Sequence, residues 1–265
     1  MSGAVVALAR ARLPTGVELE YADQGRGDAL LLLHGYADSW YSYDGVLRAL
    51  PAGVRAVAPT QRGHGDSDKP ADGYAMADFA GDAVALLDHL GIERALVCGH
   101  SMGTFVAQEL ALTRPERVRG LALVCGATTA DNPVLRGLRE EVDGLVDPID
   151  RDFAYAFQAG TVSRPLSEAV MARIMEETMK MPARVWRAAL AGLVAWRAPR
   201  ALGAIACPTL IAWGDRDEIF PLAEQHALCD AIPGAQLRVY DAGHALHWEQ
   251  PERFARDLLA LAASS

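Results

Sequence analysis

The chain has 265 residues and a formal net charge of −9, from 25 Lys and Arg against 34 Asp and Glu, and 51% of its residues are hydrophobic. A chain of this length buries roughly three-quarters of the surface that its unfolded form exposes, so its core needs no disulfides or metals. The acidic balance, without a run rich in Lys or Arg, argues against a nucleic-acid binder and against a protein that docks on anionic membranes.

The sequence also argues against a membrane or exported protein. The longest apolar stretch without a charge, residues 201–213, is interrupted by Gly203 and Pro208, and a spanning helix needs roughly 20 apolar residues. The N-terminus has no basic segment ahead of its short apolar run and makes at best a weak signal peptide. The four cysteines form no C-x-x-C pair. We expect a reduced, cytoplasmic protein without a membrane partner.

Short apolar runs alternate with amphipathic stretches along most of the chain. The predicted strands are residues 17–22, 29–33, 55–58, 95–98, 118–124, 209–213 and 236–240. The predicted helices are residues 42–50, 78–90, 101–113, 221–232 and 250–263. The later strands are continuous apolar runs, as expected of strands buried on both faces. This alternation predicts an α/β fold with a mostly parallel sheet covered on both sides by helices.

One segment departs from the alternation. From Asp131 to about Arg197 there is no strand pattern, and the helical stretches are separated by prolines. One of these helices is apolar on more than one side. Its apolar positions are Leu166, Val170, Ile174, Met171, Met175 and Met179. We interpret residues 131–197 as a helical cap inserted into an α/β body of residues 1–130 and 198–265. The alternative is that these helices belong to the same core.

A catalytic motif follows the strand predicted at residues 95–98. The sequence Gly99-His100-Ser101-Met102-Gly103 stands between a predicted strand and a predicted helix, which is the context in which G-x-S-x-G forms a nucleophile elbow. Glycines flank the serine because a Cβ would collide with the neighbouring strand or helix in so sharp a turn. We predict that Ser101 is a nucleophile. The alternative is a glycine-rich turn with a capping serine.

A serine nucleophile needs a base that a third group orients. His244 follows the strand predicted at residues 236–240, and Asp217 follows the strand predicted at residues 209–213. Both therefore lie at the carboxyl edge of the sheet, where open parallel sheets bind ligands. We predict that His244 takes the proton from Ser101 and that Asp217 holds its imidazole in the right tautomer.

Other residues compete for these roles. His247 lies three residues after His244, but His244 comes first after its strand and follows a glycine. Asp217 is preferred to Asp215 because the longer distance from the strand lets the chain turn back toward the histidine. Asp131 is a third candidate for the acid.

An acyl-transfer enzyme also stabilises an oxyanion, at around 3 kcal/mol per donor. One predicted donor is the backbone N–H of Met102, at the positive end of the helix that follows the serine. The second is the backbone N–H of Tyr36, since Gly35 lets the backbone approach closely. His34 precedes the nucleophile in the chain, and we interpret it as fixing this loop by hydrogen bonds.

Five motifs together resemble those of the α/β-hydrolase superfamily: residues 30–36, 61–67, 99–103, 214–221 and 243–251. They look most like its capped esterases, lactonases, haloperoxidase-like enzymes and meta-cleavage hydrolases. The resemblance implies an eight-stranded, mostly parallel sheet, a lid after the sixth strand and a Ser101–His244–Asp217 triad. Gln61 departs from the family, which usually has Asp before Arg-Gly-His-Gly, and we expect this to affect loop packing. Relatives that use carboxylate chemistry have Asp at the elbow, so Ser101 excludes that chemistry.

The substrate pocket is expected between the sheet edge and the cap. Its predicted lining residues are Trp40, Phe157, Met175, Met179, Trp186 and Trp196. An apolar pocket of this kind predicts a mainly uncharged ester or lactone, cleaved through an acyl-enzyme. The same triad would also serve a C–C bond hydrolase or a cofactor-free perhydrolase, and the fold can also serve as a ligand receptor.

The sequence predicts no cofactor and no metal, because the histidines form no His-Glu-x-x-His motif and no cluster with cysteines. No Arg or Lys is evidently placed to bind a substrate carboxylate, with Arg173, Arg184 and Arg187 of the cap left open. The expected partner is the small-molecule ester or lactone, and the expected assembly is a monomer or a homodimer.

Overall fold

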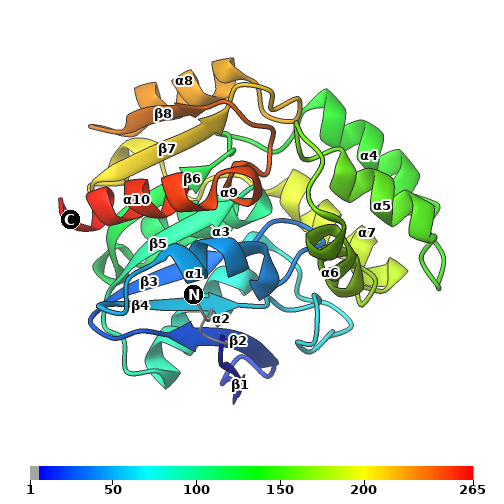
Figure 1. Ribbon diagram of the computed structural model, residues 1–265, viewed down its shortest axis with the longest axis horizontal. Coiled ribbons are helices and arrows are strands. Elements are labelled where there is room, and N and C mark those ends of the chain that lie inside the picture. Colours follow the sequence, from blue (N-terminus) through cyan, green and yellow to red (C-terminus); the bar gives the residue numbers. More distant parts are fainter. Residues whose placement is uncertain (1–5, 265) are drawn as a thin grey trace.

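The computed structural model describes residues 6–264, which form a twisted sheet with helices on both faces (Figure 1). The strands lie in the order β1-β2-β4-β3-β5-β6-β7-β8. β2 pairs antiparallel with β1 and β4, and the other neighbouring strands are parallel. The strands are β1 (Leu8–Arg12), β2 (Glu18–Gln24), β3 (Asp28–Leu33), β4 (Val54–Pro59), β5 (Ala95–His100), β6 (Val118–Val124), β7 (Thr209–Gly214) and β8 (Gln236–Tyr240). The predicted eight-stranded, mostly parallel sheet is confirmed.

The helices outside the segment between β6 and β7 cover the two faces of the sheet. The α-helices are α1 (Asp44–Ala49), α2 (Met76–His89), α3 (Met102–Thr113), α8 (Leu222–Ala231), α9 (Leu246–Glu249) and α10 (Pro251–Ala262). The short 3₁₀ helices in this part of the chain are η1 (Trp40–Tyr43) and η2 (Pro115–Arg117). Figure 1 shows α1 and α10 on the near face of the sheet and α2 and α3 behind it.

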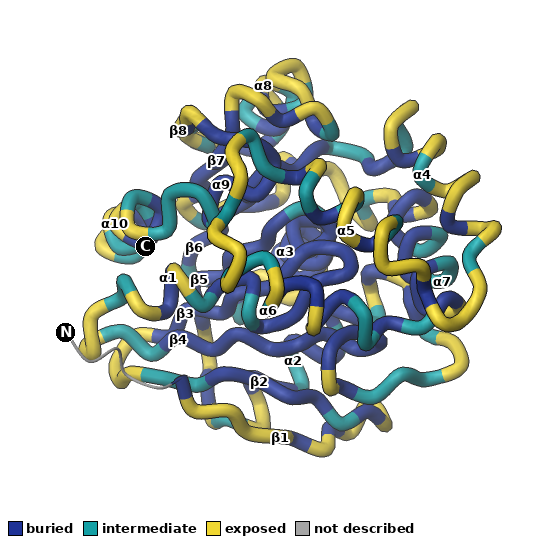
Figure 2. Tube along the Cα trace, turned by 45° about the vertical axis from the view of Figure 1, so that its right-hand side comes forward, coloured by how far each residue is buried: buried dark blue, intermediate teal, exposed yellow. Residues whose placement is uncertain are grey.

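The central strands contribute to two apolar cores, because successive residues of a strand point to opposite faces. In β3, Leu31 and Leu33 pack in the core that contains the apolar side chains of α2 and α3. Leu30 and Leu32 pack in the core that contains those of α1 and α10. Figure 2 shows the central strands buried along nearly their whole length. The continuous apolar runs of β3, β5, β6 and β7 are explained by this burial on both faces.

The two ends of the sheet differ from the prediction. Leu8–Arg12 is not among the predicted strands. Four of its five residues are exposed, and its short alternation of Ala and Arg contains no large apolar residue facing the core. β8 is a strand, but it is not buried on both faces, since only Tyr240 of its five residues is fully buried. As an outer strand it has a neighbour on one side only.

The short 3₁₀ helix η3 (Leu202–Ala204) precedes β7, and four α-helices lie between β6 and β7 at the carboxyl end of the sheet (Figure 1). We refer to them as the cap: α4 (Pro133–Asp143), α5 (Arg151–Ala159), α6 (Glu168–Thr178) and α7 (Ala183–Ala195). The first three begin after a polar residue whose side chain accepts a hydrogen bond from the first helical turn. These residues are Asn132, Asp150 and Ser167. The helices follow the sixth strand, as the resemblance implied.

The cap packs on the body through backbone as well as side chains. A Cβ at Gly192 of α7 would lie 1.9 Å from the carbonyl oxygen of Tyr74, so only glycine allows this helix to come so close. Trp186 of α7 is fully buried and contacts Tyr36 of the body at a ring-centroid distance of 5.1 Å. The cap is therefore closely packed onto the sheet edge.

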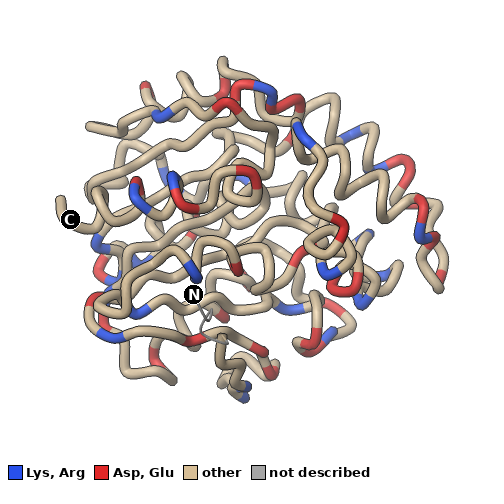
Figure 3. The backbone as a smooth tube through the Cα atoms, in the orientation of Figure 1, with Lys and Arg blue, Asp and Glu red and all other residues tan. Residues whose placement is uncertain are grey.

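The surface is mixed in charge, with acidic and basic residues interspersed along the backbone (Figure 3). Among the described residues, no helix combines the length and the apolar character that crossing a membrane requires.

One ion pair is buried beside the body's strands. The Arg62 guanidinium donates from Nε to Oδ2 of Asp82 at 2.6 Å and from Nη2 to Oδ1 at 2.7 Å. Its third nitrogen donates to the carbonyl oxygen of Gly73 at 2.8 Å. The two side chains are 8% and 4% exposed. Arg62 belongs to the 61–67 motif, so this pair anchors that loop to α2.

We expect Asp82→Asn to lower the free energy of unfolding by about 3–5 kcal/mol, because it leaves the Arg62 charge buried without its carboxylate. Urea unfolding measures the change. The matched control is Asp88→Asn, which removes a carboxylate that is 62% exposed and pairs with Arg117, at a cost of about 1 kcal/mol or less. Equal losses in the two variants would contradict this account of the buried pair.

Candidate active site

Ser101 occupies a sharp turn between β5 and α3. Its backbone has φ of 51° and ψ of −117°, in a region that L-residues rarely adopt. A Cβ at Gly99 would lie 2.1 Å from the carbonyl oxygen of Gly103, and a Cβ at Gly103 would lie 2.2 Å from that of Leu33. The flanking glycines are therefore required by backbone contacts, as the motif predicted.

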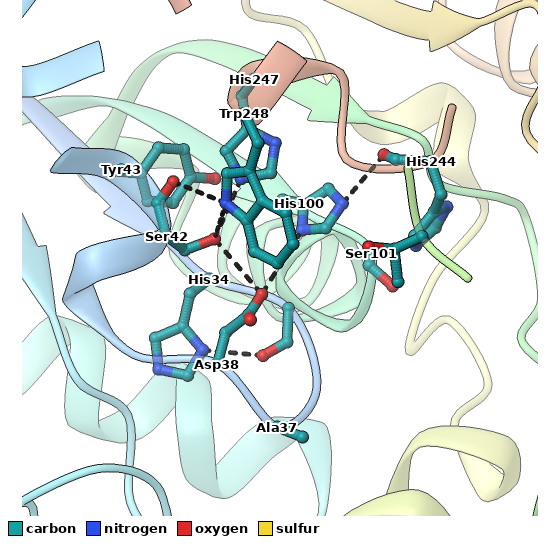
Figure 4. A network of polar contacts seen from close by, with 12 residues as sticks. His34, Ala37, Asp38, Ser42, Tyr43, His100, Ser101, His244, His247 and Trp248 are labelled. Atoms are coloured by element: carbon teal, nitrogen blue, oxygen red, sulfur yellow. Dashed lines mark hydrogen bonds and ion pairs between the residues drawn. The ribbon is translucent and has the colours of Figure 1, made fainter. Parts of the chain in front are cut away.

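His244 and Asp217 come together from the loops after β8 and β7. Nδ1 of His244 lies 3.0 Å from Oδ2 of Asp217, and the two side chains are 3% and 0% exposed. The other carboxylate oxygen accepts hydrogen bonds from the backbone N–H groups of Ile219 and Phe220, at 2.8 and 3.1 Å. Nδ1 thus donates to the carboxylate, which leaves Nε2 with its lone pair. Figure 4 shows the His244 ring beside Ser101.

The competing acids lie elsewhere. Asp215 is exposed, and its backbone N–H donates to the carbonyl oxygen of Tyr240. Asp131 pairs with Arg136 and Arg197. Only Asp217 among the three candidates contacts His244.

His247 belongs to a different group of contacts. Its Nε2 lies 2.9 Å from Oγ of Ser42, and its ring packs on His100 at 4.3 Å and on Tyr43 at 5.0 Å. Burial lowers the pKa of His247 to about 3, so the ring is neutral at physiological pH. It packs at the start of the last helices, as the sequence favoured.

The loop that follows β3 lies next to the elbow. A Cβ at Gly103 would also come within 2.8 Å of the carbonyl oxygen of His34, so the end of β3 touches the first turn of α3. Tyr36 lines the same cavity as Ser101, and its hydroxyl donates to the carbonyl oxygen of Trp186 at 2.6 Å. Met102 is the first residue of α3. The two predicted oxyanion donors therefore belong to segments that meet at the serine.

His34 and Gln61 hold this loop in place by hydrogen bonds. Nε2 of His34 accepts from the backbone N–H of Gln61 at 2.9 Å, while Nδ1 donates to the carbonyl oxygen of Gly35 at 2.7 Å. The side-chain amide of Gln61 donates in turn from Nε2 to the carbonyl oxygen of His34 at 2.8 Å. Burial holds the pKa of His34 well below its usual range. The residue that departs from the family pattern thus serves loop packing.

A cavity of about 360 Å³ opens over Ser101 and His244. Its lining is largely apolar, as is typical of small-molecule sites. The apolar and aromatic lining residues are Tyr36, Val134, Leu135, Leu138, Phe157, Leu193, Ile219 and Trp248. Its charged lining residues are Asp38, Glu141 and Glu218, and none of the residues that line it is Lys or Arg.

Of the six residues predicted to line the pocket, Phe157 does so. Trp186 and Trp196 instead pack in the core, where their indole nitrogens donate to the Met181 carbonyl and to the Glu109 carboxylate. Trp40 is buried in the core beneath α1, and Met179 packs against the core on the opposite face. Met175 lines a separate cavity between α5 and α6. Large apolar side chains of the cap mostly hold the cap to the body, and sequence pattern alone does not separate that role from substrate contact.

The three cap arginines that the sequence left open as carboxylate binders do not line the cavity. Arg173 pairs with Glu176 and Glu177. Arg184 donates to the carbonyl oxygens of residues 69 and 70, and Arg187 donates to that of residue 145. Each guanidinium is thus occupied by partners that do not line the cavity.

Sequence reasoning missed Asp38 as a site residue. It is 6% exposed and lines the cavity, and burial raises its pKa to about 7. Its oxygens accept from Oγ of Ser42 at 3.2 Å and from Nε2 of Gln158 at 3.4 Å. The only signal in the sequence was its place four residues after His34, in the loop of the oxyanion donor.

Cys125 brings a thiol close to the His244–Asp217 pair. Its Sγ and the ligand atoms of Asp217 and His244 lie within 4.8 Å of one another. Burial raises the pKa of the thiol well above its usual range, whereas metal binding needs a thiolate. Asp217 and His244 already use their facing atoms for each other. The donor set therefore does not fit a metal well.

The cap also holds the loop that carries His244. The backbone N–H of Ala245 donates to the carbonyl oxygen of Thr161, in the connection between α5 and α6, at 2.8 Å. The carboxylate of Glu249 accepts from Ser163 of the same connection and from the backbone N–H of Gly243 at 2.7 Å. Residues on both sides of His244 are thus tied to the cap.

The fold is that of an α/β hydrolase. Residues 28–251 match the family described as the alpha/beta hydrolase fold, and the chain belongs to that family.

Individual relatives are esterases, lactone-degrading enzymes and meta-cleavage hydrolases, which confirms the predicted resemblance. The chain is 32% identical to a 2-hydroxymuconate semialdehyde hydrolase of Pseudomonas sp. (strain CF600), over 94% of this chain and 90% of that one. A thermophilic esterase from Thermogutta terrifontis is 26% identical, with a TM-score of 0.87 over 97% of this chain and 98% of that one. Est816, described as an N-acyl homoserine lactone degrading enzyme, is 30% identical, with a TM-score of 0.76 over 95% and 99%.

The elbow geometry predicts that Gly103→Ala destabilises the protein by about 3 kcal/mol, because the new Cβ meets backbone that moves only if β3 moves. Thermal or urea unfolding measures this loss. The control is Gly81→Ala in α2, where a Cβ has no heavy atom within 4 Å, and we expect a gain of about 0.5–1 kcal/mol there. A Gly103→Ala protein as stable as wild type would show that the elbow tolerates a side chain.

Proposed function

We propose that the protein is a serine hydrolase that cleaves a mainly apolar, uncharged carboxylic ester or lactone through an acyl-enzyme. The observation that carries the proposal is the hydrogen bond of His244 to Asp217, at 3.0 Å, beside a strained Ser101 at the floor of an apolar cavity. Relatives that are named as esterases and as a lactone-degrading enzyme support the choice of bond.

The proposed reaction has two halves. Ser101 Oγ attacks the carbonyl carbon while Nε2 of His244 takes the hydroxyl proton, and the resulting imidazolium is stabilised by Asp217. The backbone N–H groups of Tyr36 and Met102 bind the oxyanion. The tetrahedral intermediate expels the alcohol oxygen, which receives the proton from His244. Water then attacks the acyl-enzyme by the same steps, which frees the carboxylic acid and restores Ser101.

A C–C bond hydrolase is the second candidate, because a named 2-hydroxymuconate semialdehyde hydrolase is 32% identical over most of both chains. A muconate carries a carboxylate. The cavity offers that charge three carboxyl side chains and no Lys or Arg among its lining residues, and burying an unpaired charge is costly. The cavity therefore favours an uncharged ester or lactone.

We expect Ser101→Ala to lower kcat/KM for p-nitrophenyl hexanoate by about 10⁴-fold or more, because the residue supplies the nucleophile. A fluorophosphonate probe located by mass spectrometry should label Ser101 in the wild type. Retention of more than a few per cent of the activity by the variant, or labelling of a different residue, would contradict the proposal.

The assignment of base and acid is tested with matched pairs. We expect His244→Ala to lose about as much kcat/KM as Ser101→Ala, and His247→Ala to stay within about tenfold of wild type. Asp217→Asn should lower kcat by about 10⁴-fold, while Asp215→Asn at an exposed position should leave it nearly unchanged. Equal losses within either pair would reassign that role.

Charge selectivity is tested with two esters of equal chain length. We expect kcat/KM for mono-p-nitrophenyl adipate, which ends in a carboxylate, to be about tenfold or more below that for p-nitrophenyl hexanoate, because the cavity has no cation to pair with the charge. Cleavage of 2-hydroxymuconate semialdehyde is measured beside them. Faster turnover of that substrate than of either ester would replace the proposal by the C–C bond hydrolase.

A further inference from the structure

The wall of the cavity next to Ser101 contains two hydrogen-bond acceptors that face each other. Nδ1 of His100 lies 4.0 Å from Oδ2 of Asp38. The two side chains are 3% and 6% exposed, and both residues line the cavity. Figure 4 shows His100 between Asp38 and Ser101.

The contacts of His100 fix which of its nitrogens is the acceptor. Nε2 lies 3.1 Å from the carbonyl oxygen of His244. A carbonyl carries no hydrogen, so Nε2 must donate, and Nδ1 of the neutral ring is left with a lone pair. Burial holds the pKa of His100 well below its usual range, so the ring is neutral. Nδ1 is buried and has no hydrogen-bond partner, which is rare for a buried polar atom.

Gly35 lies against both acceptors. A Cβ built on Gly35 would lie 2.8 Å from Nδ1 of His100 and 3.3 Å from Oδ2 of Asp38. Only glycine therefore lets this turn of the loop lie against both acceptors. Gly35 immediately precedes Tyr36, the proposed oxyanion donor, so the two acceptors lie close to where the substrate carbonyl would bind.

Asp38 has donors of its own on the other sides of its carboxyl group. Ser42 of η1 and Gln158 of α5 each donate one hydrogen bond to it. Oδ2 of Asp38 also faces Nδ1 of His100, which carries no hydrogen and therefore cannot donate to it. When Asp38 is ionised, neither Oδ2 nor Nδ1 has a hydrogen to donate to the other.

On the proposed function, we propose that Asp38 and His100 form a polar subsite for a hydrogen-bond donor on the carbon next to the scissile carbonyl. The substrate class is then an α-hydroxy or α-acylamino ester or lactone. Its hydroxyl or amide N–H donates to Oδ2 of Asp38, next to Nδ1 of His100, while the backbone N–H of Tyr36 binds the carbonyl oxygen. The rest of the substrate occupies the apolar part of the cavity.

The test compares substrates that differ only in the donor. One pair is the p-nitrophenyl esters of 2-hydroxyhexanoate and 2-methylhexanoate, and the other is N-hexanoyl homoserine lactone and α-heptyl-γ-butyrolactone. The donor preference is the ratio of kcat/KM within a pair. We expect this ratio to fall about tenfold from wild type to Asp38→Asn, because a neutral amide is a weaker acceptor than a carboxylate. Intrinsic reactivity cancels when the two proteins are compared.

The matched control is Glu109→Gln, which neutralises a buried carboxyl group outside the cavity. We expect its donor preference to equal that of the wild type. An unchanged preference in Asp38→Asn would overturn the subsite, and so would an equal loss on both members of each pair. A preference confined to the hydroxyl pair or to the acylamino pair selects that substrate class.

A second readout uses the wild type alone, in case Asp38→Asn fails to fold. The pKa of Asp38 is raised to about 7 by burial, so the carboxylate, the better acceptor, accumulates as the pH rises through 7. We expect the donor preference to increase severalfold between pH 5.5 and 8.5. A preference that is independent of pH would overturn the role of Asp38.

The other groups around Asp38 do not produce this change. His100 and His247 are neutral over the range, since burial depresses the pKa of each. His244 acts on both members of a pair, so its contribution cancels in the ratio. Glu141 and Glu218 line the cavity but are exposed. Absence of Ser101-dependent hydrolysis of either ester would refute the proposed function itself, which is distinct from a lack of donor preference in an active enzyme.

Discussion

The backbone of α3 rests directly on the backbone of β3, with no side chain between them, and the positions of the site residues follow from this contact. The carbonyl oxygens of Leu33 and His34 occupy the space that a Cβ on Gly103 would need. The chain must therefore leave β5, turn through Ser101 with a positive φ and enter the helix within a few residues. The same contact brings the loop after β3, from Gly35 onward, to the side of the serine. The proposed nucleophile and the proposed oxyanion loop are placed by one steric fit.

Burial gives the site its electrostatic character. The rings of His244, His100 and His247 follow one another at centroid distances of 4.9 and 4.3 Å. Burial depresses the pKa values of His100 and His247, and repulsion between neighbouring imidazolium charges lowers them further. Asp217 is different, because two backbone N–H groups of its own loop and the His244 ring satisfy it. Of these three imidazoles, His244 is the one that donates a hydrogen bond to a carboxylate.

The parts that the sequence predicted are those that depend on local backbone chemistry. The Gly-x-Ser-x-Gly turn, the loop histidine and the alternation of buried strands follow from short-range rules, and the acid and base could be ranked by their distance from a strand end. Asp38 and the unpartnered nitrogen of His100 could not be found, because their relation depends on three loops meeting in space. The prediction of the cap aromatics as pocket residues was wrong for a related reason. An indole that packs on the body and an indole that contacts a ligand have the same sequence pattern. An exposed edge strand such as β1 has no run of large apolar residues from which a strand could be predicted.

The hydrogen bonds between the cap and the loop of His244 make the two a single mechanical unit. Ala245 is bound to Thr161, and Glu249 bridges Ser163 and Gly243. A cap that swung away as one body would pull the imidazole from Ser101, so an open molecule would be an idle one. Passage of substrate then falls to small movements at the rim, where Val134 and Glu141 of α4 line the cavity and are exposed. The exposed rim of the cavity on α4 and the connection between α5 and α6 that holds the loop of His244 are thus different parts of the cap.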